Sequence, residues 1–264
     1  MLDFFWLLLL AFTGLVSSDH ALASDSAKNI FLLAGQSNMA GRGGEVHQRW
    51  DGVVPPECHP NPSILRLSAG LSWEEACEPL HKDIDVSKIC GVGPGMPFAH
   101  YILDKNSSIG VVGLVPCAIG GTKISQWALG TYFYKQLVRR AKAALHCGGT
   151  IRALLWYQGE SDTVTLEGAK LYKRRLEKFI TDLRHDLQSP TLPVIQVALA
   201  SGEGSYIEEV REAQLGIDLP NVRCVDAKGL QLQPGNLHLS TFAQVRLGEM
   251  LANAYLQILP SPQN

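Results

Sequence analysis

Two residues of this 264-residue chain have the chemistry of a nucleophile and its general base. Ser37 lies in the segment 35–39 (GQSNM), directly after a short apolar run that ends in glycine. His238 lies near the other end of the chain, just before a segment with helical spacing. An imidazole that accepts the proton of a serine hydroxyl makes that oxygen a better nucleophile, and such pairs occur on unrelated folds. The two residues therefore predict acyl-transfer chemistry if the fold brings them together.

Neither residue defines a site by itself. The segment 35–39 is not the G-x-S-x-G elbow of α/β-hydrolases, because Met39 stands where the second glycine would be. A serine at a helix start is more often a simple cap, and a loop histidine is more often merely solvated. Backbone N–H groups beside Ser37, at the start of a short helix, could nevertheless hold an oxyanion.

Two further polar clusters follow apolar runs of the sequence. The segment 116–122 (PCAIGGT) contains tandem glycines, which either form a tight turn or allow the backbone to approach a ligand closely. The segment 156–162 (WYQGESD) brings an amide, a glycine and two acids together. Each cluster by itself is weakly specific. Together with the segments of Ser37 and His238 they make four clusters at the ends of successive predicted strands, which indicates one shared site.

The elements that must position these clusters alternate along the chain. Apolar runs predict five strands, at 30–34, 109–115, 151–157, 194–199 and 222–225. Helical spacing predicts helices at 132–146, 166–187, 206–217 and 240–256. Residues 41–98, rich in glycine and proline, are expected to form a long irregular excursion. The alternation predicts one α/β domain over residues 24–264, a three-layer α/β/α sandwich with a mostly parallel five-stranded sheet. Ligands of such sheets bind beyond the carboxyl ends of the strands.

The amino terminus indicates export. Residues 4–16 form an apolar run that is too short to span a bilayer, and an A-x-A site at 21–23 follows it. We therefore expect a signal peptide over residues 1–23, a secreted protein, and no membrane association after cleavage; an uncleaved anchor or a buried helix is the alternative. Asn106, followed by two serines, is a candidate N-glycosylation site in that route.

Cysteine content and charge indicate which bridges, metals and partners to expect. The six cysteines permit disulfides in an exported protein, and we expect a bridge within residues 58–90, where three of them lie. The cysteines and histidines of that segment match no standard zinc spacing, so no metal is expected. Lys and Arg number 23 against 25 Asp and Glu, a balance that predicts no nucleic-acid partner.

The four motifs together resemble a known family. The segments 35–39 (GQSNM), 120–122 (GGT), 156–161 (WYQGES) and 236–240 (NLHLS) are similar to those of the sialate O-acetylesterase-related (SASA) carbohydrate esterases. That family belongs to the SGNH-hydrolase superfamily, and the similarity is greatest to its plant carbohydrate esterases. The resemblance covers roughly residues 29–257 and implies a flavodoxin-like α/β/α domain.

The resemblance also implies an activity and roles for individual residues. It implies hydrolysis, without cofactor or metal, of ester groups, typically acetyl, on carbohydrates or polysaccharides. Ser37 would be the nucleophile, and His238 the general base that later protonates the leaving alcohol. The backbone N–H groups of Ser37 and Gly121 would bind the oxyanion, with the side chain of Gln158 as a further donor.

The orienting acid departs from the superfamily pattern. An aspartate usually stands three residues before the histidine, and that position is Gly235 here. Glu160 is the first substitute that the resemblance suggests, and Asp226, at the end of the fifth predicted strand, is the second. The remaining alternative is a dyad of Ser37 and His238 in which a backbone carbonyl orients the ring.

Two residues are candidate substrate contacts, and two other functions compete with esterase activity. Gln36 and Asn38, beside the nucleophile, either fix its turn or contact sugar hydroxyls. The missing aspartate also allows a non-catalytic or weakly active glycan-binding protein on the same fold. A lipase for apolar esters is a third possibility, which the small glycine-lined site disfavours.

Overall fold

The computed structural model of the chain describes residues 27–146 and 148–259. The predicted signal peptide and Cys147 lie outside the described residues. A seven-stranded sheet forms the centre of the molecule, in the order β5-β4-β6-β1-β7-β8-β9. All neighbouring strands run parallel except β4 and β5. The strands are β1 (Asn29–Gly35), β4 (Ile64–Leu67), β5 (Trp73–Glu75), β6 (Val112–Pro116), β7 (Thr150–Tyr157), β8 (Val194–Ala198) and β9 (Val222–Asp226), and a separate hairpin joins β2 (Glu45–Val46) and β3 (Arg49–Trp50).

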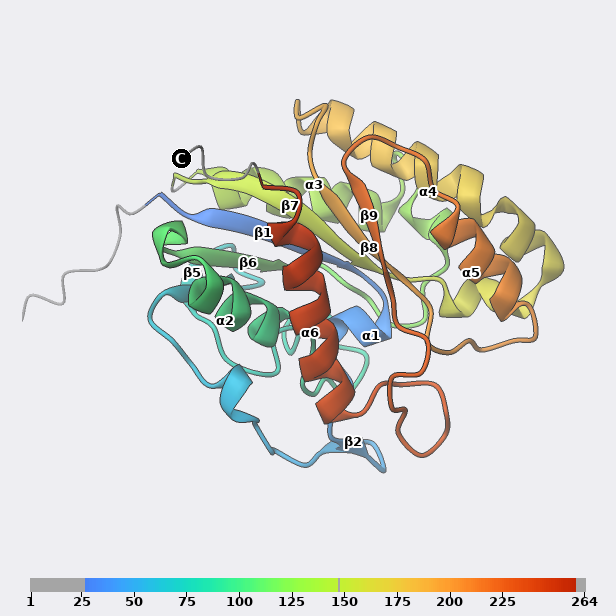
Figure 1. The fold of residues 1–264 in the computed structure, drawn as a ribbon, viewed down its shortest axis with the longest axis horizontal. Helices are drawn as coiled ribbons and strands as arrows, with labels where there is room; N and C mark the ends of the chain where they lie inside the picture. The colour runs from blue at the N-terminus through green and yellow to red at the C-terminus, as the bar shows by residue number, and fades with distance from the viewer. Residues whose placement is uncertain (1–26, 147, 260–264) are drawn as a thin grey trace, which may run out of the picture.

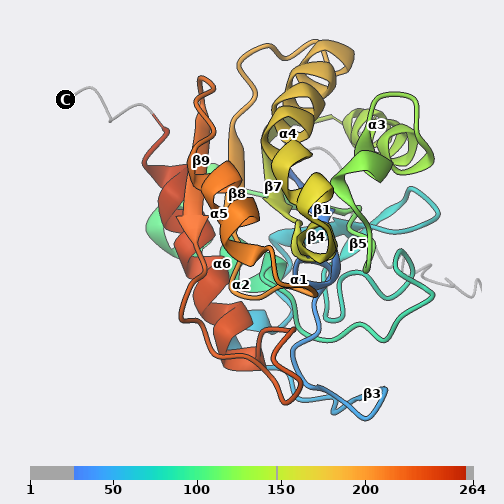
Figure 2. The same cartoon turned by 90° about the vertical axis from the view of Figure 1, so that its right-hand side faces the viewer.

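Helices cover both faces of this sheet, so the expected three-layer α/β/α class is confirmed (Figure 1). Helices α2 and α6 lie side by side on one face, and α3 and α4 lie on the other, with α5 packed against α4 (Figure 2). The α-helices are α1 (Ser37–Ala40), α2 (Gly95–Lys105), α3 (Tyr132–Leu145), α4 (Leu166–Asp186), α5 (Ile207–Leu215) and α6 (Thr241–Leu256). Short 3₁₀ helices are η1 (Pro56–Cys58), η2 (Ser107–Ile109), η3 (Ile124–Trp127) and η4 (Glu160–Val164).

The sheet has two more strands than predicted, because β4 and β5 lie in the segment expected to be irregular. Arg66 interrupts the short apolar run of β4, and that charge conceals the strand in the sequence. The side chain is nevertheless buried, since its guanidinium donates to Glu74 at 2.7 Å and to Asp83 at 2.8 Å. A buried charge is tolerated where it is paired in this way. The pairing therefore depends on tertiary contacts that periodicity cannot show.

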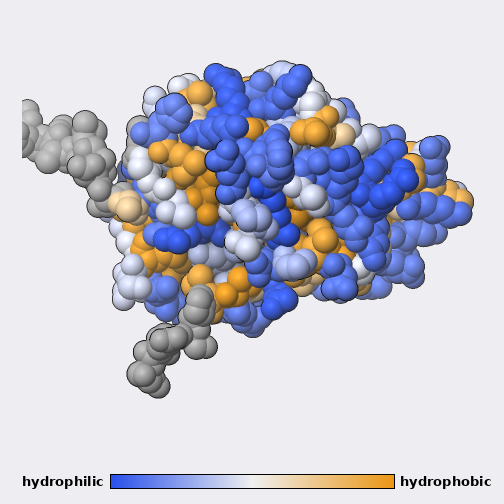
Figure 3. All heavy atoms as spheres, turned by 90° about the horizontal axis from the view of Figure 1, so that it is seen from above, coloured by the Kyte–Doolittle hydropathy of each residue, from blue (hydrophilic) through white to orange (hydrophobic). Residues whose placement is uncertain are grey.

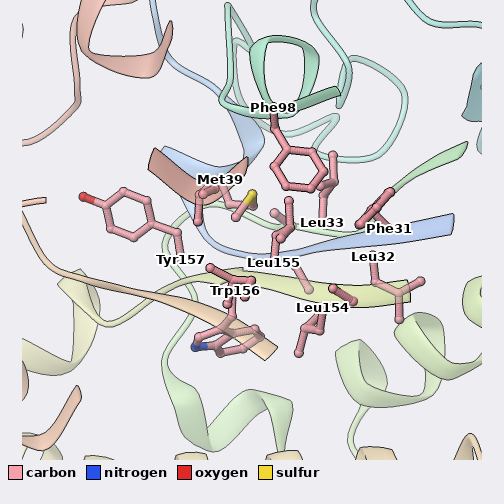
Figure 4. Close-up of a cluster of buried hydrophobic side chains, with 14 of the residues drawn as sticks. Phe31, Leu32, Leu33, Met39, Phe98, Leu154, Leu155, Trp156 and Tyr157 are labelled. Carbon is pink, nitrogen blue, oxygen red and sulfur yellow. The ribbon is translucent and has the colours of Figure 1, made fainter. Parts of the chain in front are cut away.

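The central strands β1 and β7 carry the core. Residues 30–34 are fully buried, as expected for a strand covered on both faces. Figure 4 shows Phe98 and Met39 on one side of these strands, and Trp156 and Leu154 on the other. The rings of Phe98, from α2, and Phe31 lie 4.9 Å apart in an edge-to-face arrangement. Packing on both faces holds the carboxyl ends of β1 and β7 in place, where the polar motifs begin.

The outer face of α4 is solvated. Its cations Lys170, Lys173, Arg174 and Lys178 are exposed, while apolar residues of the same helix are buried. The side of the molecule seen in Figure 3 is mostly hydrophilic, with apolar residues in small separate groups. None of the described helices is long and apolar enough to cross a membrane.

The predicted disulfide is not present among the residues that the structure describes. Cys58, Cys77, Cys90, Cys117 and Cys224 are all free thiols. Burial raises the pKa of the Cys90 and Cys117 thiols to about 11, which keeps them protonated. In the described ranges, His, Cys, Asp and Glu side chains form no cluster of three that could hold a metal ion.

We expect Ser240→Ala to lower the free energy of unfolding by about 1 kcal/mol. Ser240 is the N-cap of α6, and its Oγ accepts a hydrogen bond from the N–H of Ala243 at 3.2 Å. Alanine leaves that N–H without a protein acceptor. Urea unfolding checks the effect, with Ser240→Asn, which keeps an acceptor, as the control. Equal stability of the alanine variant and the wild type would contradict the cap.

Candidate active site

Ser37 lies where β1 ends and the short helix α1 begins. Gly35 adopts a φ of +130°, a conformation that favours glycine, and the N–H of Gln36 donates to the carbonyl of Tyr157 at 2.8 Å. The chain therefore leaves the sheet in a sharp turn at the carboxyl ends of β1 and β7. Ser37 is 6% exposed and is the first residue of α1, so its N–H has no partner within that helix.

His238 reaches the same point from the opposite end of the chain. Its Nε2 lies 3.1 Å from Oγ of Ser37, within hydrogen-bond distance. Two cavities border the ring: one of about 320 Å³ that Gly235 and Val46 also line, and one of about 440 Å³ that Lys88 also lines. The predicted nucleophile and base are therefore adjacent, and the base lines both cavities.

The glycine loop after β6 lies beside this pair. The N–H of Ile119 donates to the carbonyl of Gly35 at 3.0 Å, which ties the loop to the end of β1. Gly121 has a φ of +73° with open space around its α-carbon. No hydrogen bond within the described residues occupies the N–H groups of Ser37 or Gly121. Neither N–H is therefore committed to a protein acceptor in the described part of the chain, as an oxyanion donor requires.

The two candidate acids do not touch the imidazole. Oε1 of the fully buried Glu160 accepts a hydrogen bond from Nδ2 of Asn38 at 2.7 Å. The half-exposed Asp226 pairs with Arg211 at 3.0 Å. Among the described residues, no carboxylate is hydrogen-bonded to the ring of His238. The structure thus brings the nucleophile and the base together but places neither predicted acid on the ring.

The predicted oxyanion donor Gln158 and the two candidate sugar contacts are enclosed in the protein and line neither cavity. Gln36, Asn38 and Gln158 are all fully buried. Nε2 of Gln158 lies 2.7 Å from both the carbonyl of Thr122 and Oδ2 of Asp162. Its two amide hydrogens are therefore directed at acceptors of the protein, and this side chain joins the motif loops instead of donating to an oxyanion. Burial likewise removes Gln36 and Asn38 from contact with a sugar.

Sequence reasoning misses the site residues that the segment 41–98 contributes. Arg42 and Asp85 form a buried ion pair behind the site, and Oδ2 of Asp85 also accepts from the N–H of Gly120 at 3.1 Å. That bond supports the glycine loop next to Gly121. Lys88 is exposed and lines the larger cavity with His238. No motif marks these residues, because their segment lacks the periodicity that reveals buried elements.

The imidazole is held in its neutral form. Burial, together with the positive charges of Arg42 and Lys88, lowers the pKa of His238 to about 4. A general base must be unprotonated to accept a proton. His238 is therefore in the form required of a base at neutral pH.

This pKa predicts a pH profile for catalysis by His238. A lowered pKa keeps the imidazole neutral as pH falls, so kcat/KM should be flat from about pH 5 to 8 and should drop tenfold per pH unit below about pH 4. Initial rates on an acetyl ester, corrected for spontaneous hydrolysis and with folding followed by circular dichroism, measure the profile. An inflection near pH 6.5, the ordinary histidine value, would contradict the described environment of the ring.

Comparisons with known proteins show which family the chain is similar to. The family model for carbohydrate esterases described as sialic acid-specific acetylesterase (SASA) matches residues 27–257. A probable carbohydrate esterase of Arabidopsis thaliana is 57% identical over 234 residues, which cover 86% of this chain and 90% of that protein. An X-ray structure of an Arabidopsis thaliana protein, 56% identical, matches with a TM-score of 0.85 over 89% of this chain and 100% of that chain.

A more distant structure shares the architecture alone. The crystal structure of NanS is 19% identical and matches with a TM-score of 0.69 over 88% of this chain and 97% of that chain. The two chains thus share the three-layer α/β/α fold. The chain belongs to the SASA family of carbohydrate esterases.

Proposed function

We propose that this protein is a serine esterase that removes O-acetyl groups from glycans or cell-wall polysaccharides. The observation that carries the proposal is the 3.1 Å contact between Oγ of Ser37 and Nε2 of His238. The ring of His238 also lines two cavities. The pair lies at the carboxyl ends of parallel strands, where ligands of α/β sheets bind. Membership of a carbohydrate esterase family supports the substrate class.

The geometry supports a two-step acyl transfer. Oγ of Ser37 attacks the acetyl carbonyl carbon while Nε2 of His238 takes the hydroxyl proton. The oxygen of the tetrahedral intermediate accepts hydrogen bonds from the N–H groups of Ser37 and Gly121. The bond to the sugar oxygen then breaks, and that oxygen receives the proton from the imidazolium. Water, deprotonated by His238, hydrolyses the acetyl-enzyme, and acetate leaves as Ser37 regains its proton.

The compartment is also part of the proposal. An exported protein fits the predicted signal peptide over residues 1–23, and we place its action in the cell wall or apoplast. Asn106, the candidate glycosylation site, is partly exposed and precedes β6, at the end of the sheet opposite to Ser37. A glycan there would leave both cavities open to a polysaccharide.

Acyl-chain preference tests the proposal. Wild-type protein should release acetate from an acetylated xylan and from 4-nitrophenyl acetate, and should hydrolyse 4-nitrophenyl octanoate far more slowly. A preference for the octanoate would favour a lipase. A phosphonate inhibitor reactive toward serine should label Ser37, located by mass spectrometry of the labelled peptide. Labelling at another residue would contradict the assigned nucleophile.

A glycan-binding protein without turnover is the second candidate. It is favoured by one observation, that the described carboxylates leave the ring of His238 without an acid partner. Binding of the deacetylated polysaccharide in calorimetry, with no acetate released from the acetylated form, would establish this candidate in place of the esterase.

A further inference from the structure

A single buried amide joins the nucleophile segment to the loop that carries His238. Oδ1 of Asn38 accepts a hydrogen bond from the N–H of Leu239 at 2.9 Å. Nδ2 of the same side chain lies 3.4 Å from the carbonyl of Leu237. Asn38 therefore contacts the residue before His238 and the residue after it, while its own backbone adjoins Ser37. One side chain thus sets the distance between the two proposed reacting groups.

The orientation of this amide depends on Glu160. Oε1 of Glu160 accepts from Nδ2 of Asn38 at 2.7 Å, and both side chains are fully buried. Turning the amide by 180° would place its oxygen against an oxygen of Glu160, and its NH₂ against the N–H of Leu239. Each of these contacts pairs two acceptors or two donors and costs free energy in a buried site. An acceptor at position 160 therefore keeps Oδ1 directed at the histidine loop.

The backbone of Asn38 is held as well. Nε2 of Gln244, from α6, donates to the carbonyl of Asn38 at 3.1 Å. The carbonyl of Leu237 also accepts the hydroxyl of Ser201. The amide thus lies between two anchored backbones and has little freedom to adjust. A displacement of about 1 Å between reacting groups costs roughly 10²-fold in rate.

We infer that Asn38 is a positioning residue that holds His238 against Ser37, and that Glu160 acts through Asn38, as the acceptor that orients its amide. This inference rests on the proposed function and adds to it a role for the glutamate of the WYQGES motif. The negative charge of Glu160 is not required in this role. An uncharged oxygen at the same place serves equally well.

Glu160→Gln separates this role from that of an acid that stabilises imidazolium. Glutamine keeps an oxygen acceptor at the same reach but carries no charge, so we expect kcat for 4-nitrophenyl acetate to stay within about fivefold of wild type. Replacing the triad acid of a serine protease by its amide costs about 10⁴-fold. A fall of about 10³-fold or more in Glu160→Gln would therefore overturn the inference. Thermal unfolding of each variant verifies that it is folded.

Removing the acceptor at position 160, or the amide at position 38, should instead lower kcat. Glu160→Ala and Asn38→Ala are expected to lower kcat by about 10²-fold with KM within about threefold, because the histidine moves while the binding surface stays. Asn253→Ala, on the exposed side of α6, is the matched control and should retain wild-type kcat. Wild-type kcat in Asn38→Ala would overturn the inference. If that variant does not fold, equal kcat in Glu160→Gln and Glu160→Ala overturns it instead.

The same measurements distinguish failure of the inference from failure of the proposed function. Wild-type turnover that is lost in Glu160→Gln rejects the positioning role of Glu160 and leaves the serine esterase standing. Absence of turnover in the wild type rejects both, because the inference rests on the reaction.

Discussion

Replacing Ser37 by alanine is expected to lower kcat for acetyl ester hydrolysis by at least about 10⁴-fold. Alanine removes the oxygen that lies 3.1 Å from the imidazole, and no acetyl-enzyme can form without it. The backbone N–H groups at positions 37 and 121, which we propose bind the oxyanion, remain in this variant, so hydrolysis above the spontaneous rate should persist. Acetate release measured at enzyme concentrations high enough to detect that residual rate gives the size of the effect.

His238→Ala should lower kcat about as much as Ser37→Ala does. The double variant should lose little more than either single variant, because the two residues act as one unit. Ser125→Ala, at an exposed position in η3, is the matched control and should keep wild-type activity. Additive losses in the double variant would contradict a Ser37–His238 pair. Wild-type activity in Ser37→Ala would place the nucleophile elsewhere.

Gly35→Ala is expected to destabilise the fold by about 4 kcal/mol or more. A β-carbon at this position would lie 2.0 Å from the carbonyl oxygen of Tyr157, which is backbone of the neighbouring strand and cannot turn away. The φ of +130° adds strain for any residue with a side chain. Because the same turn delivers Ser37, any folded fraction should also lose activity. Urea unfolding followed by tryptophan fluorescence measures the free energy of unfolding.

Gly110→Ala provides the matched control. Gly110 also has a positive φ, of +67°, but a β-carbon at this position would have nothing within 4 Å, so only the backbone preference is lost, about 1–2 kcal/mol. The difference between the two variants isolates the steric contact of β1 with β7. Equal destabilisation by both would show that this close approach is not required.

A strand can be predicted from the sequence where it contains a continuous apolar run of several residues. β1, with residues 30–34 buried, and β7, with residues 153–157 buried, can be predicted because each contains a continuous apolar run, as strands covered on both faces do. β4 is not predicted because it has only four residues and Arg66 divides them, so that no continuous apolar run is left. The short polar edge strand β5 has no periodic pattern either. A buried arginine becomes acceptable only when its partners, Asp83 and Glu74, arrive from other segments.

The order of residues along the chain was enough to establish the chemical types at the site: a serine after the first strand, and a histidine before the last helix. What surrounds these two residues depends on how the chain packs in three dimensions. The ring of His238 has no described acid partner, and Glu160 contacts Asn38 instead. Hydrogen-bond partners are selected by the packing of loops that lie far apart in the chain, whereas local patterns report only burial and backbone preference.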